Sequence, residues 1–145
     1  MGKVESLHIS KGKNKERINV ECIECKKEYG IIGDSYAGKG EKQVSLIAAE
    51  TIGDMGKCCT DSPKPGEFKE NITTSGLNLA LYPIGTRIKI GSSVHEISEV
   101  GKTCYLFCDI DGGEKSCPIP INTVFTKVIK DGKVAIGDVI EVLFA

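Results

Sequence analysis

The chain has 145 residues, of which 27% are charged and 40% are hydrophobic, and its formal net charge is −1 at pH 7. This length fits a single domain, residues 1–145, that buries a core without disulfide support. The balanced charge and the absence of Trp argue against a nucleic-acid-binding surface. No apolar run reaches the roughly 20 residues of a membrane helix, and the N-terminus lacks the apolar run of a signal peptide. We expect a cytoplasmic protein.

Short strands dominate the expected secondary structure. Alternation of polar and apolar residues, together with β-branched content, predicts strands at 4–10, 18–22, 87–90, 94–97, 104–110, 124–129 and 138–144. Residues 44–52 are the one helical candidate, either throughout or as a short strand that runs into a helix. Seventeen glycines suit many tight turns between short strands. The pattern predicts a mainly β fold, a closed or nearly closed β-barrel with one or two short helices.

Two of the seven cysteines, Cys22 and Cys25, have the Cys-x-x-Cys spacing of zinc and redox sites. We expect this pair to end a strand and lead into a loop, whereas a thioredoxin-like site opens a helix. Zinc needs four ligands. The second pair would come from Cys58 and Cys59, whose adjacent side chains diverge, or from the cysteines nearer the C-terminus.

Three further cysteines, Cys104, Cys108 and Cys117, lie within fourteen residues. An odd total of cysteines argues against a closed disulfide framework, so these thiols are expected to be reduced. Reduced cysteines this close together bind metals, carry sulfur or attack electrophiles more often than they cross-link a fold. The alternative is that some of them fill the core, because a free Cys behaves as a small hydrophobe.

Four other polar residues are candidates with a structural alternative. His8 and His95 lie on predicted strands among apolar residues, and packed or surface positions are favoured for both over metal ligation. His8 has a weak additional claim to a site at the barrel mouth. Glu70 and Asn71 follow a Pro/Gly loop and precede an apolar residue, where buried polar groups must find hydrogen bonds. On local grounds, Asn71 is favoured to close a turn with its own backbone.

Several segments match one known pattern in order and spacing. They are 4–10, 30–34, 43–46, Pro-Gly-x-Phe-x-Glu-Asn-Ile at 65–72, 76–77, 81–91, Gly-Lys-x-Cys-x-x-x-Cys at 101–108, and 128–138. Together they resemble the MOSC domain, found at the C-terminus of eukaryotic molybdenum cofactor sulfurases and in stand-alone bacterial proteins. The resemblance covers nearly the whole chain and is greatest to the short stand-alone branch.

The resemblance implies a β-barrel that takes part in molybdenum-cofactor or sulfur chemistry. It implies that Cys104 is the sulfur carrier or the thiol at the cofactor site, and it places Glu70 and Asn71 in the family's fixed motif near that site. A thiolate is a soft metal ligand and also accepts sulfur as a persulfide.

Strand alternation adds candidates around Cys104. Lys102 and Cys108 share a strand face with Cys104, and Lys102 can supply the positive charge that lowers a thiol pKa. Cys117 follows a turn and can fold back as a resolving thiol, although Cys108 is equally suited to the barrel core.

We expect a stand-alone MOSC domain that binds molybdenum cofactor (molybdopterin), with Cys104 as the metal ligand, or that carries sulfur on Cys104 as a persulfide. Its partner would be a separate cysteine desulfurase or molybdoenzyme. One alternative is a non-catalytic, zinc-bound or thiol-rich interaction module that uses Cys22, Cys25 and the cluster of Cys104, Cys108 and Cys117. A weaker one is a molybdenum-dependent reductase of N-hydroxylated compounds. Whether the chain is an enzyme is left open.

Overall fold

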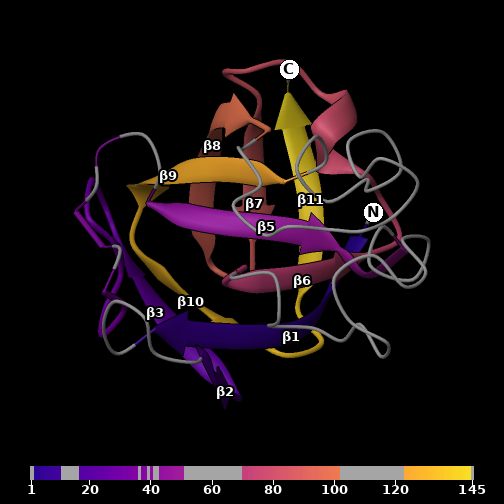
Figure 1. Ribbon diagram of the computed structural model, residues 1–145. Helices are drawn as coiled ribbons and strands as arrows, with labels where there is room; N and C mark the ends of the chain where they lie inside the picture. The colour runs from indigo at the N-terminus through magenta and orange to yellow at the C-terminus, as the bar shows by residue number, and fades with distance from the viewer. Residues whose placement is uncertain are drawn as a thin grey trace, which may run out of the picture.

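The computed structural model describes residues 2–10, 17–35, 37, 38, 40, 43–50, 70–101 and 123–144, and Figure 1 shows their arrangement. These residues form eleven strands and one 3-10 helix. The elements are β1 (Gly2–Ser10), β2 (Arg17–Val20), β3 (Cys22–Lys26), β4 (Gly30–Ile31), β5 (Val44–Ala48), β6 (Ile72–Ser75), η1 (Leu79–Leu81), β7 (Arg87–Ile90), β8 (Ser93–Val100), β9 (Val124–Lys130), β10 (Gly132–Ala135) and β11 (Val139–Phe144).

Seven strands close into a barrel in the order β1-β11-β7-β8-β9-β5-β6, which returns to β1. Strand β1 makes this closure because it pairs with β6 along one edge and with β11 along the other. The pairs are antiparallel except β5–β6, which is parallel. Closure leaves no open edge among the seven. The prediction of a mainly β barrel is confirmed.

Two features lie outside the seven-stranded ring. Strand β2 pairs with β1 beyond the end of β11, so it extends the sheet past the barrel wall. A small sheet of β10, β3 and β4 forms a second layer. The turn between β7 and β8 holds it, because the Ser92 backbone N–H donates to the Lys133 carbonyl at 3.0 Å.

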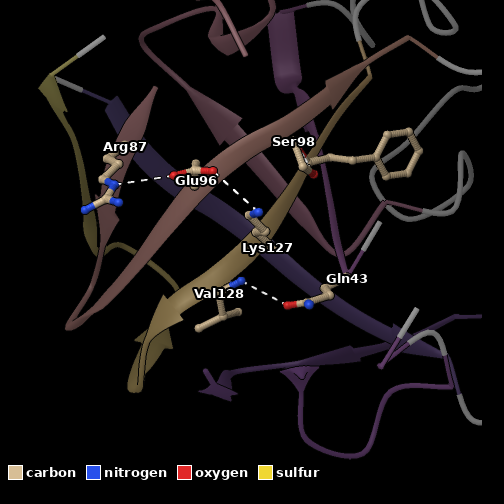
Figure 2. A network of polar contacts seen from close by, with 7 residues as sticks. Gln43, Arg87, Glu96, Ser98, Lys127 and Val128 are labelled. Atoms are coloured by element: carbon tan, nitrogen blue, oxygen red, sulfur yellow. Dashed lines mark hydrogen bonds and ion pairs between the residues drawn. The ribbon is translucent and has the colours of Figure 1, made fainter. Parts of the chain in front are cut away.

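The core lies inside the barrel and follows the two-residue period of the strands. In β7, exposed Arg87 and Lys89 alternate with completely buried Ile88 and Ile90. Each such isoleucine contributes about 1.5–3 kcal/mol through removal of its side chain from water. On the outer surface, Glu96 of β8 lies between Arg87 and Lys127, with N–O distances of 3.4 and 3.6 Å (Figure 2). Such exposed ion pairs contribute little to stability.

Most predicted strands are confirmed, and the differences have local causes. The predicted strand 18–22 is interrupted by a bend at Glu21, which separates β2 from β3. The Cys22–Cys25 pair lies in β3, which ends at Lys26 and leads into a turn at 27–29, so the pair ends a strand and precedes a loop as expected. Residues 44–52 begin as strand β5, and helical backbone starts at Ala49. The predicted strand 104–110 lies outside the described residues.

Three strands were not predicted from the sequence: β4, β6 and β10. They have two to four residues each, too few for an alternating pattern to be detected. Strand β6 is also buried on both faces, so it shows no alternation of polar and apolar residues.

Candidate functional site

Polar side chains line the outer face of β1, β5 and β6, yet they are buried. Leu7, Leu46 and Ile72 are paired neighbours on these strands and point into the barrel core. Polar residues lie on the opposite face of these strands and at the two positions that precede β6. We call them the polar face: Ser6, His8, Ser45, Glu70, Asn71 and Thr73. All except Ser6 are less than 9% exposed. A buried polar surface outside the hydrophobic core is the strongest candidate for a site among the described residues.

Asn71 is the centre of the polar face, because its side chain connects the strands on either side of β6. Its Oδ1 accepts hydrogen bonds from the Ser45 backbone N–H at 3.0 Å and the Ser45 hydroxyl at 3.3 Å. Its Nδ2 donates to the His8 carbonyl at 3.1 Å. The partners are 26 and 63 residues away in the chain. The interpretation of Asn71 as a local turn residue is therefore wrong.

Asp34 ties the turn after β4 to this junction. Its Oδ1 accepts from Asn71 Nδ2 at 3.2 Å and from the Ser10 backbone N–H at 2.7 Å. The next residue, Ser35, donates its backbone N–H to the Ser10 carbonyl at 2.8 Å and its hydroxyl to the Ser10 hydroxyl at 2.9 Å. The end of β1, the turn after β4 and the beginnings of β5 and β6 thus meet at one place.

His8 and Glu70 are held beside Asn71 by hydrogen bonds that define their orientation. His8 Nδ1 lies 3.1 Å from the Glu70 carbonyl oxygen, and a carbonyl only accepts, so Nδ1 carries the proton. The Glu70 carboxylate accepts the Thr73 hydroxyl at 2.8 Å. His8 is completely buried, in agreement with the prediction that it is a packed histidine. Glu70 is equally buried, so the side chains of His8 and Glu70 are both held in place within the polar face.

The segment that contains Lys102, Cys104, Cys108 and Cys117 lies outside the described residues, but both of its ends are placed. The Gly101 backbone N–H donates to the Thr123 carbonyl at 2.7 Å. Paired residues form one row across the strands from β8 to β6, namely Val100, Val124, Leu46 and Ile72. The two ends of the segment leave the sheet beside this row. Strands β9 and β6 are two strand spacings apart in this row, about 10 Å. The two ends are therefore close to the polar face.

The second histidine belongs to a different cluster, inside the barrel. His95 Nε2 lies 2.9 Å from the Ser93 hydroxyl, which itself donates to the Ile90 carbonyl at 2.9 Å. His95 Nδ1 lies 3.0 Å from the Thr126 hydroxyl. The ring is completely buried, and desolvation lowers its pKa from 6.5 to about 4. His95 is thus a neutral, hydrogen-bonded core residue, as the sequence favoured.

Strand β3 separates the two cysteines of the proposed zinc pair. Cys22 is exposed and Cys25 is 1% exposed, because residues three apart on a strand lie on opposite faces. Burial raises the pKa of the Cys25 thiol to about 11, which outweighs the opposing effect of its hydrogen bond with Ser93. This pair is not arranged to chelate one ion. Within the described ranges, no group of three or more His, Cys, Asp and Glu side chains is placed to hold a metal.

Sequence reasoning identified Glu70, Asn71 and, weakly, His8, but it missed Asp34 and Ser45. Ser45 belongs to the helical candidate 44–52, and neither residue was singled out as a site residue. Their signal lies only in the family-like segments 30–34 and 43–46. In the part of the chain that the structure describes, no helix is long and apolar enough to cross a membrane.

A model of the MOSC domain matches residues 33–141, and the chain therefore belongs to the MOSC domain family. No curated protein sequence matches the chain.

Solved structures share its fold. The YuaD protein of Bacillus subtilis superposes with a TM-score of 0.76 at 19% identity, over 98% of this chain and 96% of YuaD. YiiM of Geobacillus stearothermophilus gives 0.71 at 15% identity, over 99% of this chain and 75% of YiiM. YiiM of Escherichia coli gives 0.62 at 18% identity, over 99% and 70%.

Proposed function

We propose that this MOSC domain binds molybdenum cofactor or carries sulfur for its assembly, with Cys104 as the reactive thiol. The observation that carries the proposal is the buried polar face, which contains Glu70 and Asn71. Strand β6 of this face lies two strand spacings from β9 and three from β8, the strands that lead into and out of the Cys104 segment. Family membership supports the link to this chemistry. A reduced thiol in the cytoplasm is part of the proposal.

The chemistry of the residues fits a pterin. Carboxylate, imidazole and hydroxyl groups of the polar face suit the N–H and O–H groups of the heterocycle. Lys102 would hold an anionic group, and the Cys104 thiolate would be a soft ligand for molybdenum. When bound, the cofactor would supply redox and oxygen- or sulfur-transfer chemistry. Glu70, oriented by Thr73, would hold the heterocycle, and Asn71 would keep Glu70 and His8 in place.

In the sulfur-carrier role, the Cys104 thiolate attacks the terminal sulfur of a persulfide on a donor protein. A new S–S bond forms on Cys104, the S–S bond of the donor breaks, and the donor cysteine leaves as a thiolate. No electrons are exchanged with a third reactant. A cysteine desulfurase is the class of donor that supplies such a persulfide, and a molybdoenzyme is the class of recipient.

The carrier role is tested by mass spectrometry after incubation with a cysteine desulfurase and cysteine. We expect a mass gain of one sulfur atom that is lost in Cys104→Ser and retained in Cys108→Ser. Cys22→Ser is the matched control because Cys22 is an exposed thiol on β3, which contributes no residue to the polar face. A chain that gains no sulfur, or gains it only on Cys22, would rule out the carrier role.

Cofactor binding is tested separately on protein purified from its native host. Molybdenum and oxidised pterin are measured in the wild-type chain, Cys104→Ser and Glu70→Gln. We expect Cys104→Ser to lose the metal and Glu70→Gln to lower the pterin content, because an amide replaces the carboxylate acceptor. Stoichiometric zinc that disappears in Cys22→Ser would instead support the interaction module, which the opposite placement of Cys22 and Cys25 does not favour. No described residue specifically favours an N-hydroxyl reductase.

A further inference from the structure

A polar cavity lies where the turn between β7 and β8 meets the turn between β10 and β11. Its volume is about 390 Å³, which falls within the range of roughly 300–1,000 Å³ that is typical of small-molecule sites. Its lining comes from β7, β10, β11 and the two turns, and it includes Lys89, Ser92, Lys133, Asp138, Val139 and Glu141. None of these residues belongs to the polar face.

Hydrogen bonds of the backbone hold the two turns in place around this cavity. The Lys133 N–H donates to the Ser92 hydroxyl at 2.8 Å, and the Ser92 N–H donates to the Lys133 carbonyl at 3.0 Å. In the turn before β11, Asp138 Oδ2 accepts the Ala135 N–H at 2.8 Å. These bonds fix the lining backbone, so the cavity is formed before a ligand binds, as is usual for small-molecule sites.

The charged groups of the cavity are not paired with one another. Lys89 and Glu141 occupy directly opposed positions on β7 and β11, where opposite charges commonly interact. Arg87, two residues earlier on β7, does form such an ion pair, with Glu96. Within the described residues, neither Lys89 nor Lys133 nor Glu141 has a side-chain hydrogen bond or ion pair. Their charges are therefore accessible to a ligand.

The balance of charge in the cavity indicates the class of ligand. Lys89 and Lys133 contribute two ammonium groups, and Asp138 and Glu141 contribute two carboxylates. The carboxylates would repel a simple anion and the ammonium groups a simple cation, whereas a zwitterion is attracted by both kinds of group. Val139, which is 53% exposed, adds an apolar surface to the same lining. This combination matches an amino acid, which carries a carboxylate, an ammonium group and a side chain on one carbon.

We propose that this cavity binds a free amino acid with an aliphatic side chain. Its carboxylate lies between Lys89 and Lys133, its ammonium group contacts Asp138 and Glu141, and its side chain packs on Val139. Ion pairs between solvent-accessible groups are weak, so we expect a dissociation constant on the order of 1 mM. The site goes beyond the proposed function and does not depend on it, because the polar face takes no part.

NMR spectroscopy of the full, isotope-labelled chain tests the proposal, with L-leucine as the probe at constant ionic strength. We expect saturable shifts of the Gly91, Ser92 and Val139 amide signals. L-Leucinamide lacks the carboxylate and N-acetyl-L-leucine lacks the ammonium group, and each should bind at least about fivefold more weakly than L-leucine. The absence of a saturable shift up to the solubility limit of leucine would overturn the proposal. So would binding of inorganic phosphate without binding of leucine, since the cavity would then be a simple anion site.

Variants of the lining test whether the cavity itself binds the probe. Lys133→Gln and Glu141→Gln each remove one charge contact and should weaken leucine binding about fivefold. Lys130→Gln is the matched control, because Lys130 is an exposed lysine of β9 outside the cavity lining. The remaining amide signals of each variant report that it is folded. An equal loss in Lys130→Gln would contradict the proposal, because leucine would then respond to overall charge. A negative result here leaves the Cys104 experiments unaffected.

Discussion

At the scale of single residues, Asn71 connects the strands around the polar face through one side chain. Its amide satisfies the Ser45 N–H of β5 and the His8 carbonyl of β1, and it also contacts the Asp34 carboxylate. Truncation would remove one hydrogen bond from each of these buried groups. Each buried polar group that loses its hydrogen bond costs about 1–3 kcal/mol.

We therefore expect Asn71→Ala to lower the free energy of unfolding by about 3 kcal/mol, measured by urea denaturation. Asn78→Ala is the control of the same residue type, because Asn78 only caps η1, through one bond to the Ala80 N–H. Its expected loss is about 1 kcal/mol. Equal losses in the two variants would contradict the central role of Asn71.

His95 makes stability depend on pH. An unfolded chain protonates this histidine below about pH 6.5, whereas in the native state its pKa is about 4. The unfolded state binds more protons between these values. The contribution of neutral His95 to the free energy of unfolding is therefore complete above pH 6.5 and is lost as the pH falls to about 4. The loss amounts to about 3 kcal/mol.

His95→Gln should remove this dependence, since glutamine does not titrate. Unfolding free energies measured between neutral pH and about pH 4 should fall by about 3 kcal/mol more in the wild-type chain than in the variant. The comparison cancels the carboxylates that both proteins share. Parallel curves for the two proteins would show that His95 is not protonated on unfolding in this range.

At the scale of elements, the turn between β7 and β8 determines how the small sheet lies on the barrel. Gly91 has φ of 58°, and a Cβ there would overlap the Lys133 carbonyl and lie 2.6 Å from Asp138 Oδ2. Glycine is thus required for two reasons, its backbone conformation and the close approach of β10. Gly137 also has a positive φ, of 92°, but a Cβ there meets nothing within 4 Å.

Gly91→Ala should consequently destabilise the fold by about 3 kcal/mol, the sum of backbone strain and steric overlap. Gly137→Ala should cost about 1 kcal/mol, from backbone strain only. Thermal or urea unfolding of the two variants gives the comparison. If Gly137→Ala were the more damaging of the two, the close packing of the turn on β10 would not be a determinant of stability.

At the scale of the whole molecule, barrel closure brings the candidate site together. Strand β1 must pair with β6 and β11 simultaneously, and this places His8 beside residues 62 and 63 positions later in the chain. The same closure leaves β2 outside the ring. Formation of the polar face is thus a consequence of where β1 lies.

Much of this architecture can be read from local pattern. The alternation in 4–10, 87–90 and 94–97 predicts strands because the two faces of a strand meet different surroundings. A barrel follows from many short strands and turns, and the order of the motifs indicates the family. Lys102, Cys104, Cys108 and Cys117 stay predictions, because they lie outside the described residues.

The polar junction, in contrast, depended on tertiary structure. Asp34, Ser45 and Asn71 are each unremarkable in their local sequence, and their hydrogen bonds span 26 and 37 residues. Strand pairing, and not local pattern, decides which distant residues become neighbours, since hydrogen-bond partners are defined only once register and closure are complete. Opposite faces of β3 likewise separated Cys22 from Cys25, although their spacing in sequence is that of a metal site.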